Sequence, residues 1–202
     1  IAYDNGGVND RFRGRVIFPV HTLSGKVVAF GGRVLKKDEK TAKYVNSPES
    51  EIYHKSSELY GIYFAKQAIV KADRCFLVEG YTDVISMHQA GVENVVASSG
   101  TALTQGQIRL IHRFTSNITV LYDGDAAGIK AALRGIDLLL EDGMNVKVVL
   151  LPDGEDPRLL CPQTQREPVC RVYPAERNRF HPFQNAPAIG RRKERIRSNG
   201  RR

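Results

Sequence analysis

Acidic residues follow several apolar runs of this 202-residue sequence, at positions where strands would end. Carboxylates brought close together repel one another unless they are protonated or neutralised by a cation. Oxygen ligands without His or Cys suit Mg²⁺, which one or two carboxylates usually hold together with substrate phosphates. The sequence therefore predicts a site for Mg²⁺, with Mn²⁺ as an alternative. The acids are Glu79 and Asp83 after FLV, Asp123 and Asp125 after ITVLY, and Asp153, Glu155 and Asp156 after VVLL.

The elements that would position these acids alternate along the chain from residue 74 onward. Short apolar runs such as CFLV, NVVAS, NITVLY and VKVVLL are separated by helix-like stretches. This alternation predicts an α/β domain with a largely parallel sheet and right-handed crossovers. Because the carboxyl ends of parallel strands lie along one edge of a sheet, acids remote in sequence would converge there. One Asp-Gly pair alone indicates only a turn, but three acid-tipped strands favour a site.

Upstream of this domain the pattern is mixed. RFRGRVIFPV and VVAFGGRVL flank the turn LSGK, which predicts a β-hairpin. The polar, Pro-containing stretch KKDEKTAKYVNSPES predicts a loop. Helical spacing of Leu59, Ile62, Tyr63 and Ala65 predicts a helix over 57–72. An α+β segment would thus precede the parallel sheet.

The residues of these motifs resemble those of a known protein family. VEGYTDVISMHQAG, ASSGTALTQGQI, LYDGDAAG and LPDGEDP resemble, in order, the motifs of a Toprim domain. RFRGRVIFPV, FGGRVL, KYVNSPES and YHKSSELYG resemble the catalytic core of bacterial DNA primases of the DnaG type. The likeness runs from Asp10 to Pro157. It implies a Toprim domain over 73–157, truncated at its end, and the C-terminal part of the primase N-terminal core subdomain over 1–72.

The resemblance also implies roles for individual side chains. Glu79 would be the family's conserved acid, and Asp83 would support the site. The implied catalytic residues are Glu79, Asp83, Asp123 and Asp125, and the implied metal ligands are Glu79, Asp123, Asp125 and Asp156. The implied contacts to nucleotide phosphates or nucleic acid are Arg11, Arg13, Arg33, Lys43, Asn46 and Lys55. For each basic residue a solvated charged surface is the alternative, and for Asn46 it is a turn cap.

The stretch ASSGTALT has two interpretations. It lies between a predicted strand and a predicted helix, where free backbone N–H groups could receive a phosphate. Thr101 or Thr104 would instead cap the following helix, and this second interpretation is favoured.

The implied activity is synthesis of a short RNA primer on single-stranded DNA by metal-dependent nucleotidyl transfer from NTPs. The replicative helicase would bind through a C-terminal domain that this sequence lacks, and zinc would be confined to an N-terminal domain that it also lacks. A catalytically inactive remnant that binds only metal and nucleic acid is the alternative. A Toprim topoisomerase or nuclease is disfavoured.

Composition limits where such a protein would work. No stretch approaches the roughly 20 apolar residues of a membrane span, so no membrane partner is expected. The three cysteines are too scattered for a disulfide framework, which fits a reducing, cytoplasmic setting.

The net charge of +8 belongs to the end of the chain. Residues 158–202 hold 12 Lys and Arg against 3 Glu, whereas residues 1–157 hold 18 basic and 19 acidic residues. The tail is rich in proline and has no helical or strand periodicity, so we expect it to be disordered. Because the change falls inside a motif, a shifted reading frame or misjoined sequence is favoured over a basic nucleic-acid-binding arm.

Overall fold

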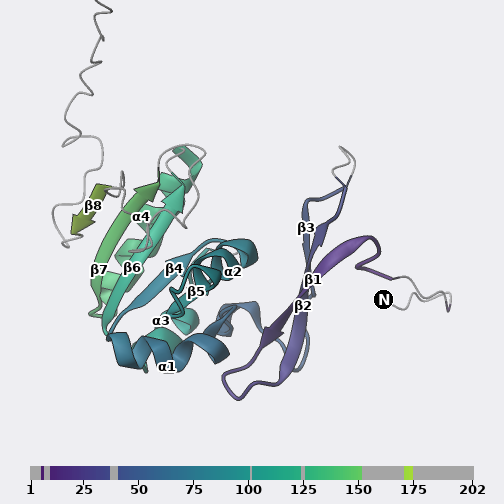
Figure 1. Ribbon diagram of the computed structural model, residues 1–202, viewed down its shortest axis with the longest axis horizontal. Helices are drawn as coiled ribbons and strands as arrows, with labels where there is room; N and C mark the ends of the chain where they lie inside the picture. The colour runs from purple at the N-terminus through teal and green to yellow at the C-terminus, as the bar shows by residue number, and fades with distance from the viewer. Residues whose placement is uncertain are drawn as a thin grey trace, which may run out of the picture.

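Two β-sheets organise the chain in a computed structural model (Figure 1). The structure describes residues 6, 10–36, 41–100, 102–123, 126–151 and 171–174, and within these it describes only the backbone of 122–123, 126–133, 150–151 and 171–174. Asp125, Asp156 and most of the tail therefore lie outside the described residues. No helix among the described residues is long and apolar enough to cross a membrane.

The first sheet is a three-stranded antiparallel sheet in the order β1-β2-β3. Its strands are β1 (Arg15–His21), β2 (Val27–Val34) and β3 (Tyr44–Asn46). The turn between β1 and β2 is closed by the Thr22 N–H, which donates to the Lys26 carbonyl at 2.9 Å. Gly25 supplies the left-handed backbone of this turn, with φ of 91°. The predicted hairpin is confirmed.

The link to the second sheet contains the 3₁₀ helix η1 (Lys55–Ser57) and the helix α1 (Ile62–Ala72). The helix predicted over 57–72 therefore begins later than expected. Tyr60 is extended because its N–H and C=O both bond Ala97, at 2.9 and 3.0 Å. Gly61 then turns the chain with φ of 87°, in a space where a Cβ would lie 3.1 Å from the Val95 carbonyl oxygen. A tertiary strand contact thus overrides the helical spacing.

The second sheet has five strands in the order β5-β4-β6-β7-β8. Four are parallel: β4 (Cys75–Val78), β5 (Val95–Ala97), β6 (Asn117–Asp123) and β7 (Asn145–Leu151). The helices α2 (Tyr81–Gln89), α3 (Gln105–His112) and α4 (Ala126–Glu141) connect them. The predicted α/β fold with a largely parallel sheet is confirmed.

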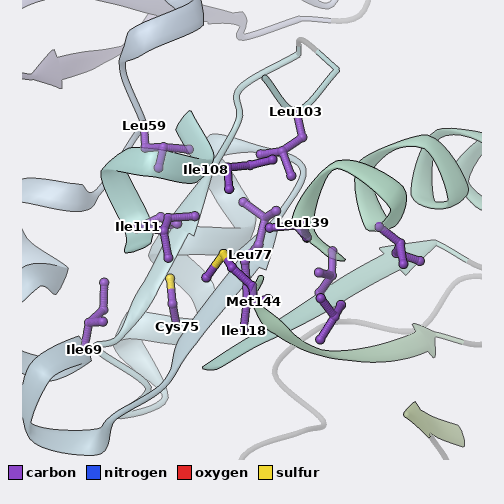
Figure 2. Packing of buried hydrophobic residues seen from close by; sticks show 14 of the residues in the cluster. Leu59, Ile69, Cys75, Leu77, Leu103, Ile108, Ile111, Ile118, Leu139 and Met144 are labelled. Carbon is purple, nitrogen blue, oxygen red and sulfur yellow. The ribbon is translucent and has the colours of Figure 1, made fainter. Parts of the chain in front are cut away.

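Alternate side chains of the parallel strands enter two separate cores. On one face, Ile118 and Val120 of β6 join the aliphatic cluster formed with α1, α3 and α4 (Figure 2). On the other face, Leu121 packs with Val84 and Met87 of α2. Helices on both faces are what a parallel sheet requires. The end of β4, which Glu79 directly follows, is therefore held by packing on both sides.

One part of the tail differs from the prediction. β8 (Arg171–Pro174) pairs antiparallel with β7, and Val172 lies opposite Val149. This four-residue strand is an exception to the expectation that the tail has almost no regular structure. Without β8, β7 would be an edge strand with unpaired N–H and C=O groups, and a short β-prone segment can satisfy these groups.

Candidate metal and nucleic-acid site

The parallel sheet brings two of the predicted acids to adjacent strand ends. Glu79 directly follows β4, and Asp123 is the last residue of β6. The register pairs Leu77 with Val120. Continued by two residues, it sets Glu79 beside Tyr122 and one place from Asp123. Both acids thus lie at the carboxyl edge of the sheet, where open α/β sheets bind ligands.

The full ligand set is not visible. Asp125 and Asp156, and the side chain of Asp123, lie outside the described residues, so their convergence with Glu79 stays a prediction. No group of three or more His, Cys, Asp and Glu side chains comes together among the described residues. Carboxylate oxygens from adjacent strand ends are nevertheless a donor set that fits a hard divalent cation such as Mg²⁺.

Asp83 acts on the backbone beside Glu79. Its Oδ2 accepts a hydrogen bond from the Gly80 N–H at 3.0 Å, which caps the first turn of α2. A carboxylate at this position satisfies an N-terminal donor and complements the positive end of the helix dipole. Asp83 therefore fixes the turn that immediately follows Glu79.

The loop after β5 lies against the same turn. The Ser99 N–H donates to the Glu79 carbonyl at 3.2 Å. Ser99 has φ of 58°, a left-handed conformation that few non-glycine residues adopt, and its Oγ is buried with no hydrogen-bond partner in the described structure. The strained backbone of Ser99 thus lies beside the acid.

Thr104 caps α3, as the favoured interpretation of ASSGTALT predicts; Thr101 lies outside the described residues. The Thr104 Oγ1 accepts a hydrogen bond from the Gln107 N–H at 3.2 Å, and the Gln107 Oε1 accepts one from the Thr104 N–H at 3.2 Å. This reciprocal arrangement is a capping box. The Thr104 hydroxyl also donates to the Ser56 carbonyl at 2.6 Å, which ties η1 to α3.

Two of the predicted basic contacts flank one aromatic ring near the acidic edge. Arg33 and Lys43 lie 5.8 and 5.9 Å from the centroid of the Tyr44 ring. The Tyr44 hydroxyl is 3.4 Å from Thr82 Oγ1, in the first turn of α2. The ring that Arg33 and Lys43 approach thus contacts the first turn of α2, which begins two residues after Glu79.

The remaining basic residues are more dispersed. Arg11 Nε donates to the Asn46 carbonyl at 3.1 Å, and Arg13 is exposed. The Lys55 N–H donates to Glu49 Oε1 at 2.9 Å. These bonds position the backbone and leave the predicted nucleic-acid contacts as predictions.

Asn46 has internal partners that the sequence does not reveal. Its Oδ1 accepts the Tyr81 hydroxyl at 2.9 Å, and its Nδ2 donates to the Ser99 carbonyl at 3.2 Å. The side chain therefore joins β3 to α2 and to the loop after β5. The predicted contact of Asn46 with nucleotide or nucleic acid is not tested by these bonds.

Two further positioning residues were missed in the sequence. Gln107 is completely buried, and its Nε2 donates to the carbonyls of Lys55 and Glu58 at 3.0 and 2.9 Å. Tyr81 is 3 % exposed, and burial, reinforced by nearby Tyr53, raises its pKa to about 12. The only local signal for Gln107 was the capping-box spacing from Thr104, and Tyr81 had none.

Comparison with known proteins identifies the family. Residues 1–66 match the family described as DNA primase catalytic core, N-terminal domain, and residues 76–160 match the family described as Toprim-like. The DNA primase of Clostridium acetobutylicum is 51 % identical over 157 residues, which are 78 % of this chain and 26 % of that protein. The chain belongs to the bacterial DNA primase family.

Solved primase structures share the fold. The zinc-binding and RNA polymerase domains of the Aquifex aeolicus primase match with a TM-score of 0.73 and 44 % identity, over 78 % of this chain and 39 % of that one. A DnaG primase catalytic domain bound to single-stranded DNA matches with a TM-score of 0.70 and 45 % identity, over 79 % and 52 %. The chain spans about a quarter of the length of the curated primases that it matches. The Toprim-like match ends at residue 160, close to the point where the motif resemblance ends.

Proposed function

We propose that this chain is a catalytic-core segment of a primase that builds short RNA primers on single-stranded DNA. The placement of Glu79 next to the end of β6 carries the proposal, because this sheet edge is where a Toprim-like primase domain would hold its metal. Arg33 lies over the ring of Tyr44, and the Tyr44 hydroxyl contacts Thr82 in the first turn of α2, which begins at the same edge. The proposal is that acids for a cation and cations for phosphates meet at this edge.

The proposed reaction is nucleotidyl transfer. The 3′-hydroxyl of a ribonucleotide attacks the α-phosphorus of an incoming NTP, the bond to the β-phosphate breaks, and pyrophosphate leaves. Glu79, Asp123, Asp125 and Asp156 would hold Mg²⁺ or Mn²⁺, which when bound activates the attacking oxygen and neutralises phosphate charge. Asp83 holds the turn after Glu79 in place.

The basic residues would bind the polyanionic substrates. Template, primer and triphosphate all carry phosphates that lysine and arginine neutralise with release of counterions. We assign this role to Arg11, Arg13, Arg33, Lys43 and Lys55, with Asn46 as a neutral polar contact. Arg33 and Lys43 lie over the ring of Tyr44, whose hydroxyl contacts Thr82 in the first turn of α2, and this supports the triphosphate as their ligand.

A remnant that binds metal and nucleic acid without synthesis is the second proposal for the isolated chain. The length of the match favours this proposal, because the chain spans only about half of a matching catalytic domain. In the whole protein we propose a cytoplasmic location, a replicative helicase as partner and zinc in a separate domain, as in the matching structure with a zinc-binding domain.

Primer synthesis tests the proposal. The isolated chain and a chimera that carries residues 10–157 in place of the matching segment of the C. acetobutylicum primase are incubated with single-stranded template, NTPs and Mg²⁺. We expect little or no synthesis by the isolated chain and synthesis by the chimera. In the chimera, Asp125→Asn should abolish synthesis without unfolding the protein, because a metal ligand is lost.

The control is Glu141→Gln at the exposed end of α4, which should leave synthesis unchanged. Synthesis by a folded Asp125→Asn chimera at the level of the unaltered chimera would contradict the assignment of the metal site. An inactive but folded chimera would favour the remnant.

A further inference from the structure

A chain of hydrogen bonds crosses from the three-stranded sheet to the acidic edge. The Tyr81 hydroxyl donates to Asn46 Oδ1 at 2.9 Å, and Asn46 Nδ2 donates to the Ser99 carbonyl at 3.2 Å. The Ser99 N–H in turn donates to the Glu79 carbonyl at 3.2 Å. These hydrogen bonds connect four residues one after another. They run from Tyr81 in α2 through Asn46 in β3 and Ser99 in the loop after β5 to Glu79 after β4.

The donor at the start of this chain is held in one orientation. The Tyr81 ring stacks on Phe18 with centroids 5.0 Å apart and meets the edge of Tyr60 at 4.7 Å. A Cβ at Gly31, which pairs with Phe18 between β1 and β2, would lie 2.5 Å from the same ring, so only glycine leaves room for it. A ring enclosed in this way can direct its hydroxyl at Asn46 with little loss of conformational freedom.

The receiving loop is strained where the hydrogen bonds reach it. Ser99 has φ of 58°, and such left-handed conformations persist only where surrounding contacts hold them. Its carbonyl is held by Asn46 and its N–H by Glu79. Loss of the Asn46 bond would therefore allow Ser99 to relax and to shift the Glu79 backbone with it.

We propose that Tyr81 and Asn46 are positioning residues that fix Glu79 for a divalent cation through the Ser99 backbone. The inference rests on the proposed function, because it needs a cation at the acidic edge. It assigns Asn46 a role inside the protein, distinct from a direct contact with nucleotide. Residues that orient metal ligands from outside the ligand set change metal affinity about 10- to 100-fold when they are replaced.

Metal affinity separates this role from nucleotide contact. Mn²⁺ is titrated into the 202-residue chain without nucleotide or DNA, and free Mn²⁺ is followed by electron paramagnetic resonance. Tyr81→Phe keeps the ring and removes only the donor to Asn46, and Asn46→Ala removes the bridge. We expect each to weaken Mn²⁺ binding by about 10-fold.

The matched control is Tyr60→Phe in the same aromatic cluster. In the described structure its hydroxyl makes no hydrogen bond that reaches Asn46 or Ser99, so the variant should bind Mn²⁺ like the unaltered chain. Amide hydrogen exchange gives a second readout, because the Ser99 amide should exchange faster in Tyr81→Phe and Asn46→Ala but not in Tyr60→Phe. Urea unfolding establishes that each variant is folded during the titration.

The results distinguish the inference from the proposed function. If the unaltered chain binds no Mn²⁺, the metal site of the proposed function fails and the inference fails with it. If the unaltered chain binds Mn²⁺ and Tyr81→Phe binds it equally well, the positioning role is overturned while the metal site stands. Equal weakening by Tyr60→Phe would also overturn it, because packing and not the hydrogen bond would be responsible.

Discussion

The two sheets of this primase segment are stabilised in different ways. The parallel sheet is covered on both faces, and many of the aliphatic side chains in its cores, such as Ile111 and Ile118, are only 0 to 1 % exposed. The three-stranded sheet has one small aromatic-rich cluster on its inner face, while Ile17 and Phe30 are more than 40 % exposed. Glu79 and Asp123 thus lie at strand ends of the more deeply packed sheet, whereas Arg33 lies on the less deeply packed one.

This difference explains why a few specific contacts between the sheets matter. The free energy gained by hydrophobic burial is roughly proportional to the apolar area removed from water and has no preferred direction. A small cluster therefore gives limited control over how one sheet is oriented on the other. Directional control comes from the fixed ring of Tyr81 and from the hydrogen bonds of Asn46. The relative position of the basic residues and the acids that we propose as ligands of phosphate and metal would therefore depend on these groups.

The largest expected effect is in the aliphatic core. Ile111→Ala should lower the free energy of unfolding by about 2 to 5 kcal/mol, because it removes apolar contacts and leaves a cavity. Ile17→Ala in the three-stranded sheet, at 41 % exposure, should cost roughly 1 kcal/mol or less. Urea unfolding measures both values. Equal costs would show that the two sheets are packed alike.

The next effect is at the contact between the sheets. Gly31→Ala would place a Cβ 2.5 Å from the Tyr81 ring, which is enclosed and cannot move freely. We expect a loss of about 1 to 3 kcal/mol, the usual cost of overpacking, and faster amide exchange in β2 and α2. Unchanged exchange in α2 would mean that the sheets are not coupled through this ring.

Alkaline pH tests the burial of Tyr81. Its folded pKa is about 12 and that of an unfolded tyrosine is about 10. Between these values the folded state retains a proton that the unfolded state has released, so stability falls as the pH rises, by about 1.4 kcal/mol per pH unit for this group. Tyr81→Phe should therefore show a shallower decline in urea unfolding between pH 10 and 12. Parallel declines for the two proteins would contradict the assignment.

The smallest effect on stability is expected for Lys55→Gln. The side chain is partly exposed in η1 and its backbone bonds would remain, so the free energy of unfolding should change by less than about 0.5 kcal/mol. Binding of single-stranded DNA should weaken, and its logarithmic salt slope should fall by about 0.7 for one lost phosphate contact. Lys71→Gln at the exposed end of α1 is the control. If Lys55→Gln left the salt slope unchanged, Lys55 would be a solvated surface residue that does not contact DNA.

Sequence patterns predicted the features that depend on local chemistry. The Ser-Gly hairpin, the alternation of strands and helices and the Thr104 cap each depend on residues close together in the chain, and the structure contains all three. The late start of α1 was missed because the Tyr60 bonds to Ala97 are long-range. The same applies to β8, whose partner strand is β7.

The site was predicted in the same uneven way. The acids are predicted to share one edge because parallel strands all end there. Glu79 follows β4 and Asp123 ends the adjacent strand β6, while the position of the other acids stays a prediction. The internal bonds of Asn46 and the burial of Gln107 depend on segments that fold together from distant parts of the chain. No spacing within one segment encodes such contacts.

Paramagnetic NMR with Mn²⁺ tests the central claim, a divalent-cation site at the carboxyl edge of the parallel sheet. Substoichiometric Mn²⁺ should selectively broaden the amide signals of Glu79, Gly80 and Ser99. The signals of Asp73 and Asn145, at the opposite edge about 20 Å away along the strands, should stay sharp. Broadening centred on that opposite edge, or none at any amide while the chain is folded, would contradict the site.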